Sequence, residues 1–190
     1  MKIGILGGTF DPPHMGHLII AEQVRSQLML DEVWFIPSNQ PPHKREARAS
    51  VDERLQMVKL AIRNNPAFHM NTIEVKRLGK SYTIETIQTL TKEFTNEHFH
   101  FIIGADMVQY LPNWHRIDEL IGLIDFVGVK RKGYTLQTPY PVMDVEVPTI
   151  EISSTVIRER LKKRESVKYL VPDAVHDFIK EHDIYGSQRS

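Results

Sequence analysis

Residues 2–17 have the sequence KIGILGGTFDPPHMGH, and this stretch decides the fold. It begins with a short apolar run, Lys2–Leu6, which continues directly into Gly7 and Gly8. Apolar residues at helical spacing follow from Leu18 to Leu28. The stretch therefore predicts a strand, a glycine-rich turn and a helix in immediate succession.

The rest of the chain repeats this alternation of strand and helix. Helical spacing recurs at Val51–Ile62, Ile84–Phe94 and Ala174–Ile179, and Ser50 with Glu53 forms a capping box before the first of these. Six apolar runs have strand character: Lys2–Leu6, Glu32–Ile36, His69–Val75, His98–Ile103, Asp125–Val129 and Val142–Val147. Such alternation predicts an α/β fold, a Rossmann-like doubly wound parallel sheet with helices on both faces. Ligands of such sheets bind at the carboxyl ends of the strands.

Length and composition limit the class of protein. We expect residues 1–190 to form a single domain, with those from about 150 onward as a C-terminal helical portion. Lys and Arg balance Asp and Glu at 24 each, which argues against a nucleic-acid partner. No apolar run approaches the roughly 20 residues that span a bilayer, so no membrane partner is expected. With no cysteine and no signal-peptide core, a cytoplasmic location is expected.

The glycine-rich turn predicts a phosphate site. Glycines allow close approach of the backbone, and the N-terminus of the next helix offers amides and a positive dipole end. His14 and His17 lie three residues apart, so they share one helix face and can donate hydrogen bonds to phosphate oxygens. Two alternatives stay open for an isolated pair of this kind. The histidines can simply cap the helix, or they can bind zinc together with Asp11 and His43.

A second helix start lies at Ile152-Ser153-Ser154-Thr155-Val156-Ile157-Arg158. Ser153 or Ser154 can cap it, and Arg158 follows four residues after Ser154 on the same face. A guanidinium there suits the β- and γ-phosphates of a nucleotide. Taken alone, the segment also fits a capped surface helix with a solvated arginine.

Together the two segments resemble the HxGH and ISSTxxR boxes of the nucleotidyltransferase superfamily. The resemblance implies transfer of a nucleotidyl group, with His14, His17 and Arg158 as the catalytic residues. It also implies an ATP site that includes these three and the residues Gly7, Gly8, Thr9, Phe10, Ile152, Ser153 and Ser154.

Three further features resemble the bacterial nicotinate mononucleotide adenylyltransferases. The first is Gly104-Ala105-Asp106, followed by Trp114. The resemblance implies that Asp106 contacts a nucleotide ribose and that Trp114 stacks on the pyridine ring. A helix opening at about Thr83, after Ser81 and Tyr82, offers amides that suit a carboxylate better than a carboxamide. Basic residues after two strands, Lys44 and Arg131, are phosphate ligands or solvated loop residues. Gly8 and Thr9 complete the expected substrate site.

The expected reaction is AMP transfer from ATP to nicotinate mononucleotide, which forms nicotinate adenine dinucleotide and pyrophosphate. Mg²⁺ is expected to accompany ATP through phosphate oxygens and water, with no dedicated protein metal ligands. Other activities stay open: pantetheine-phosphate adenylyltransferase, a cytidylyltransferase, or a nucleotide sensor without catalysis. The resemblance also permits a homo-oligomer.

Overall fold

The computed structural model describes residues 1–39, 47–77, 82–130, 136–148 and 150–186. Within these ranges six strands form one sheet, and every neighbouring pair is parallel. They are β1 (Lys2–Gly8), β2 (Glu32–Pro37), β3 (Phe68–Met70), β4 (His98–Gly104), β5 (Asp125–Lys130) and β6 (Val142–Glu146). Their order is β3-β2-β1-β4-β5-β6, so the chain winds outward from β1 in one direction and from β4 in the other. The predicted doubly wound, Rossmann-like sheet is confirmed.

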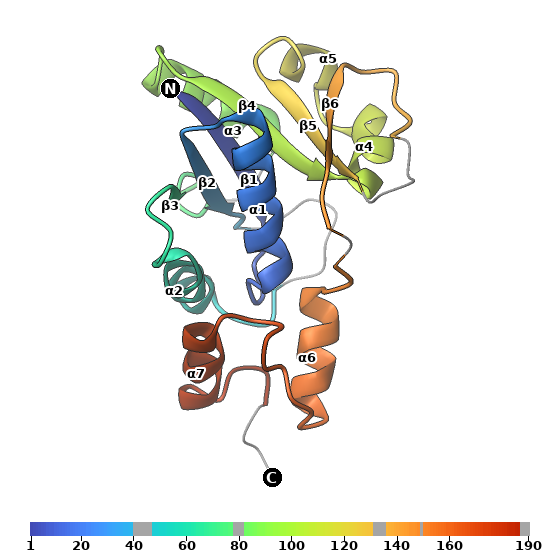
Figure 1. Cartoon of the computed structure of the whole chain (residues 1–190). Helices are drawn as coiled ribbons and strands as arrows, with labels where there is room; N and C mark the ends of the chain where they lie inside the picture. The colour runs from blue at the N-terminus through green and yellow to red at the C-terminus, as the bar shows by residue number, and fades with distance from the viewer. Residues whose placement is uncertain (40–46, 78–81, 131–135, 149, 187–190) are drawn as a thin grey trace.

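Helices cover both faces of the sheet (Figure 1). One face carries α1 (Met15–Leu28) and α2 (Val51–Ile62), and α6 (Ser154–Lys162) and α7 (Asp173–Glu181) continue the core of that face beyond the strand ends. The other carries α3 (Thr83–Glu93), α4 (Ala105–Tyr110), the 3-10 turn η1 (Leu111–Asn113) and α5 (Ile117–Leu120). Because strand side chains alternate, β4 contributes Ile102 to the first core, and Phe101 and Ile103 to the second.

The capping box before α2 is present as predicted. The Ser50 backbone N–H donates to Glu53 at 2.7 Å, and the Glu53 backbone N–H donates to the Ser50 hydroxyl at 3.3 Å. The buried face of α2, however, is not centred on the predicted stripe, because Val51 and Leu55 are only half-buried. Its fully buried residues include Arg54, Met57 and Val58.

The third predicted strand, His69–Val75, is wrong in its second half. β3 ends at Met70, and Asn71 explains why. Its backbone N–H still reaches Phe35 at 3.0 Å, but its side-chain oxygen accepts from the Ile73 backbone at 3.0 Å. Asparagine favours such a local turn over a continued ladder, so residues 73–76 leave the sheet as a turn.

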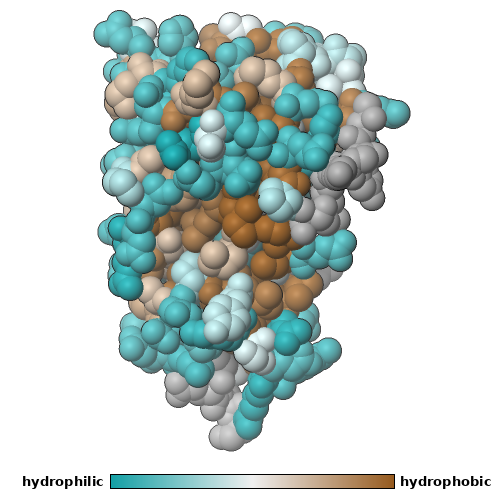
Figure 2. Space-filling model, in the orientation of Figure 1, coloured by the Kyte–Doolittle hydropathy of each residue, from teal (hydrophilic) through white to brown (hydrophobic). Residues whose placement is uncertain are grey.

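The segment after β6 lies beyond the lower ends of the strands in Figure 1, where α7 lies next to α2. A short turn, η2 (Ile184–Gly186), ends this helical portion. Figure 2, drawn from the same side as Figure 1, shows apolar surface gathered across the middle of the molecule, with hydrophilic residues above and below. Among the described helices, none is long and apolar enough to cross a bilayer.

Candidate active site

The turn after β1 is held rigidly by neighbouring backbone groups. The Gly8 carbonyl accepts from the Ser38 backbone at 2.9 Å, and the Thr9 carbonyl accepts from the Arg54 guanidinium at 2.8 Å. Phe10 has a left-handed φ of 51° and is 2% exposed. Its ring meets the His17 ring edge-on at 5.0 Å, so Phe10 supports that histidine from the core.

His14 and His17 stand together at the start of α1. Their rings stack with centroids 3.6 Å apart, and the His14 backbone N–H donates to Nδ1 of His17 at 3.1 Å. Because Nδ1 accepts, neutral His17 carries its proton on Nε2. Burial lowers the pKa of His14 to about 4, so this ring is neutral near pH 7. Its buried Nδ1 has no hydrogen-bond partner within the described ranges.

Gly16, between the two histidines, leaves room for the His14 ring. A Cβ at this position would lie 3.0 Å from Nδ1 and 3.1 Å from Cε1 of His14. The same Cβ would lie 3.9 Å from Cβ of Ile152, so the second box reaches this point as well. A glycine in the HxGH box is therefore explained by close packing of an imidazole against the helix.

The start of α1 is less open than predicted. The Met15 backbone N–H donates to the Leu170 carbonyl at 2.8 Å, and the His17 backbone N–H donates to the His14 carbonyl at 3.0 Å. The helix dipole still points at the turn, but these two amides are already bonded.

The second box is joined directly to the first. Ser153 caps α6 by accepting from the Val156 backbone at 3.2 Å, and the Ser154 hydroxyl donates to the Pro12 carbonyl at 2.8 Å. The Arg158 guanidinium donates to the Asp11 carbonyl at 2.7 Å. Arg158 is therefore held beside the glycine-rich turn and is not a solvated surface residue.

The zinc alternative does not agree with the surroundings of Asp11. The carboxylate is 5% exposed and accepts from the backbones of Arg48 at 2.8 Å and Ala49 at 3.0 Å, and from the Tyr185 hydroxyl at 2.6 Å. These bonds use the oxygens that a metal would need. No three His, Cys, Asp or Glu side chains gather suitably for a metal ion in the described part of the chain. His43 lies outside the described residues.

A second group of predicted residues lies at the carboxyl end of β4. Gly104 caps α4, and a Cβ on it would lie 2.8 Å from Oδ1 of Asp106, so the carboxylate folds back over the glycine. Trp114 is half-buried and meets the rings of Phe101 and Phe126 edge-on, each at 5.9 Å. The tryptophan is thus both core residue and partly open surface.

The start of α3 lies next to this group. Tyr82 is its N-cap residue and its ring lies 4.8 Å from that of His115, the neighbour of Trp114. The Tyr82 carbonyl accepts from the Glu85 and Thr86 backbones, which leaves the Thr83 amide ahead of the first helical bonds. The predicted helix start at Thr83 is confirmed. Lys44, Ser81 and Arg131 lie outside the described residues.

The sheet order agrees with comparisons to known proteins. Residues 5–160 match the sequence model described as cytidylyltransferase-like. The probable nicotinate-nucleotide adenylyltransferase of Oceanobacillus iheyensis is 57% identical, over 100% of this chain and 99% of the relative. The nicotinate-nucleotide adenylyltransferase of Bacillus subtilis (strain 168) is 49% identical, over 98% and 99%. The chain belongs to the nicotinate-nucleotide adenylyltransferase family.

Solved structures support the fold of this adenylyltransferase family. The Plasmodium falciparum nicotinic acid mononucleotide adenylyltransferase complexed with NaAD superposes with a TM-score of 0.83, over 100% of this chain and 99% of the other. A putative nicotinate-nucleotide adenylyltransferase from Vibrio parahaemolyticus gives a TM-score of 0.73, over 98% of this chain and 96% of the other. Identities of 19% and 18% make these likenesses evidence of fold alone.

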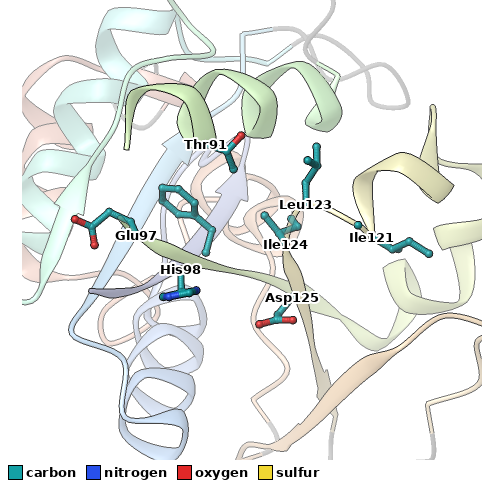
Figure 3. A pocket seen from close by; sticks show the side chains of 9 residues that line it. Thr91, Glu97, His98, Ile121, Leu123, Ile124 and Asp125 are labelled. Carbon is teal, nitrogen blue, oxygen red and sulfur yellow. The ribbon is translucent and has the colours of Figure 1, made fainter. Parts of the chain in front are cut away.

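A separate hollow of about 250 Å³ lies at the end of the sheet where β4 and β5 begin (Figure 3). One of its two acidic side chains, Glu97, is already paired with the amino group of Met1 at 2.6 Å. His98 and Asp125 lie on one side of the hollow, and Thr91 and Leu123 on the other. The first adenylyltransferase box follows the carboxyl end of β1, at the opposite end of the sheet. This hollow is therefore not part of the candidate site.

Sequence reasoning missed Arg54, which is 1% exposed. One guanidinium nitrogen donates to the carbonyls of both Thr9 and Ser38 at 2.8 Å and so ties the ends of β1 and β2 together. Burial lowers the pKa of this guanidinium, and the charge of Asp11 opposes that shift. Its position three and four residues before Met57 and Val58 places an arginine on the apolar face of α2, a signal that sequence alone contained.

Proposed function

We propose that this chain transfers the AMP group of ATP to nicotinate mononucleotide, forming nicotinate adenine dinucleotide and pyrophosphate. The observation that carries the proposal is the junction of the two boxes, where Arg158 and Ser154 bond to the carbonyls of Asp11 and Pro12. The Arg158 cation of the second box thereby lies at the same turn as the two histidines of the first box. Names of relatives that are 49–57% identical over nearly their full length supply the substrates.

Transfer requires one bond to form and one to break. A phosphate oxygen of nicotinate mononucleotide attacks the α-phosphorus of ATP, and the bond from this phosphorus to the bridging oxygen breaks, so that pyrophosphate leaves. Positioning and stabilisation of charge supply most of the rate. We assign His14 and His17 to hydrogen bonds with the phosphates, Arg158 and Lys44 to neutralisation, and Gly8 and Thr9 to backbone contacts. The remaining predicted ATP contacts, Gly7, Phe10, Ile152 and Ser153, frame this seat.

Mg²⁺ is expected to enter with ATP, carried by phosphate oxygens and water. The donor set of the site fits this role, because its nearest carboxylate, Asp11, is already bonded to two backbone amides and a hydroxyl. When bound, the ion would neutralise charge on the triphosphate. The protein side chains would then orient the phosphates around it.

The nicotinate end belongs at the carboxyl end of β4. We assign the face of Trp114 to the pyridine ring, Asp106 to a ribose hydroxyl, and the helix start at Ser81, Tyr82 and Thr83 to the carboxylate. Arg131 is assigned to substrate phosphate. The positive end of α3 favours a carboxylate over the neutral carboxamide, because a carboxylate only accepts hydrogen bonds. Residues 1–190 are proposed to act as one nucleotidyltransferase domain, since α6 and α7 share the core of α1 and α2.

The test is pyrophosphate release from ATP with three acceptors: nicotinate mononucleotide, nicotinamide mononucleotide and phosphopantetheine. We expect the highest kcat/KM with nicotinate mononucleotide. Highest efficiency with phosphopantetheine would assign the protein to that other adenylyltransferase class. Binding of ATP without pyrophosphate release with any acceptor would make it a sensor.

A further inference from the structure

We propose that Tyr185 is a positioning residue of the ATP site, which acts through Asp11 to hold the Arg158 guanidinium beside the phosphate seat. This inference rests on the proposed function, because it assigns Arg158 to ATP. Tyr185 itself belongs to η2, far from the boxes in sequence. Its hydroxyl bond to Asp11 spans 174 positions of the chain.

The backbone of Tyr185 shows that its placement is specific. Its φ of 68° lies in the left-handed region, which costs a tyrosine energy unless other contacts hold it there. The hydroxyl donates to Oδ1 of Asp11 at 2.6 Å. Burial, and then the neighbouring Asp11 charge, raise the pKa of the Tyr185 hydroxyl well above its ordinary value. The hydroxyl therefore keeps its proton near neutral pH and can donate it to Asp11.

Asp11 passes this constraint to Arg158. Its carboxylate accepts three hydrogen bonds, from the backbones of Arg48 and Ala49 and from Tyr185, so both oxygens are fixed. The carbonyl of the same residue accepts from Nη1 of Arg158 at 2.7 Å, and Nη1 lies 3.7 Å from Oδ2. The backbone of Asp11 thus bonds the guanidinium, and its carboxylate orients the guanidinium through the ion-pair contact.

The other contact of Arg158 is weaker and local. Nη2 donates to the Thr155 hydroxyl at 3.2 Å, one turn earlier in α6. Asp11 is therefore the anchor that connects Arg158 to the glycine-rich turn. Without the Tyr185 hydroxyl, Oδ1 keeps only the Ala49 amide, so the carboxylate charge that lies 3.7 Å from Nη1 of Arg158 is held less firmly.

The test compares Tyr185→Phe with Tyr169→Phe. Tyr169 is a matched control, because it also has a left-handed φ, of 67°, in the same C-terminal portion but is 79% exposed. Calorimetric titration measures binding of ATP with Mg²⁺, and of nicotinate mononucleotide separately, well below the unfolding temperature. Loss of a charge-assisted hydrogen bond predicts a Kd for ATP about tenfold higher in Tyr185→Phe. We expect the Kd for nicotinate mononucleotide to be unchanged, and Tyr169→Phe to match the wild type with both ligands.

A double-mutant cycle separates positioning from general weakening of the fold. If Tyr185 acts through Arg158, adding Tyr185→Phe to Arg158→Lys should raise the ATP Kd much less than it does in the wild type. Multiplicative effects, or equal loss of affinity for both ligands, would overturn the proposal. ATP binding is measured without transfer. A wild type that binds ATP but makes no dinucleotide would therefore reject the proposed reaction, while the Kd values would still test the role of Tyr185.

A measurement on the wild type covers the case in which Tyr185→Phe does not fold. In protein carrying ¹³C-labelled tyrosine rings, ATP should shift the Tyr185 resonance and nicotinate mononucleotide should not. Absence of an ATP-dependent shift would contradict the connection from Tyr185 to Arg158.

Discussion

The rings of His14 and His17 lie face to face, 3.6 Å apart and inclined by 24°. One backbone hydrogen bond and the edge of Phe10 hold this stack in place. Contacts within the protein thus hold the pair. Such preorganisation spares the reaction the cost of orienting donors as charge develops on the phosphates.

Replacement of His17 by alanine should lower kcat by about 100-fold or more, because one of the two aligned donors is lost. Pyrophosphate release measures turnover, and circular dichroism confirms that the variant is folded. His69→Ala, at a half-exposed histidine in β3, is the control and should retain activity. Near-normal turnover in folded His17→Ala protein would remove the histidine from the mechanism.

Gly16→Ala should separate activity from stability. Alanine improves helix propensity by about 1 kcal/mol, which opposes the cost of a small shift of the crowded His14 ring. The displaced imidazole should nevertheless lower kcat by about tenfold or more, because small errors of position are costly in catalysis. Urea unfolding and turnover are measured together.

Gly122→Ala serves as its control. The added Cβ there would lie 3.4 Å from the Glu119 carbonyl, away from the boxes. Equal activity of Gly16→Ala and wild type would show that the His14 ring needs no such close fit.

His14 should make stability depend on pH. Unfolded, its pKa is near the ordinary 6.5, whereas burial lowers the folded pKa to about 4. Between these values the unfolded chain binds more protons, so stability is complete above pH 6.5 and declines as the pH falls towards 4. The full contribution is about 3 kcal/mol.

Urea unfolding of wild type and His14→Gln across pH 4–7 measures this contribution. The variant should lose less stability on acidification than the wild type, since all other titrating groups are shared. Parallel curves for the two proteins would contradict the assignment.

Gly104→Ala should affect the acceptor and not ATP. Its Cβ would lie 2.8 Å from Oδ1 of Asp106, so the carboxylate must turn away from the strand end. We expect the KM for nicotinate mononucleotide to rise about tenfold, comparable with loss of one charged hydrogen bond. The Kd for ATP should be unaltered, and Asp106→Asn should change KM in the same direction. An unchanged KM in Gly104→Ala would place Asp106 outside the acceptor site.

Local patterns predicted the elements that position the site. The apolar run before Gly7, the box of Ser50 and Glu53, and the cap at Ser153 all act within a few residues, and each lies in the structure where sequence placed it. The end of β3 was missed, although its cause, the side chain of Asn71, is also local. The apolar run alone did not reveal that turn.

The contacts that join the boxes had no such local signal. Asp11 and Tyr185 stand 174 positions apart, and neither lies on a periodic face that would mark it as a partner of the other. The buried position of Arg54 was not predicted, because the stripe expected for α2 was defined by apolar residues alone. Resemblance to a family supplied the roles of the boxes, whereas the hydrogen bonds that support them required coordinates.

The hydroxyl of Ser154 meets the carbonyl of Pro12 across 142 positions of chain. A loop of this length closes slowly relative to local helix formation, since non-local contacts are rewarded only after the chain entropy has been lost. During refolding, helical signal should therefore return before catalytic activity. The delay between the two would measure how slowly the segment from Ile152 onward docks on the first box. Recovery of activity would therefore report this late folding step.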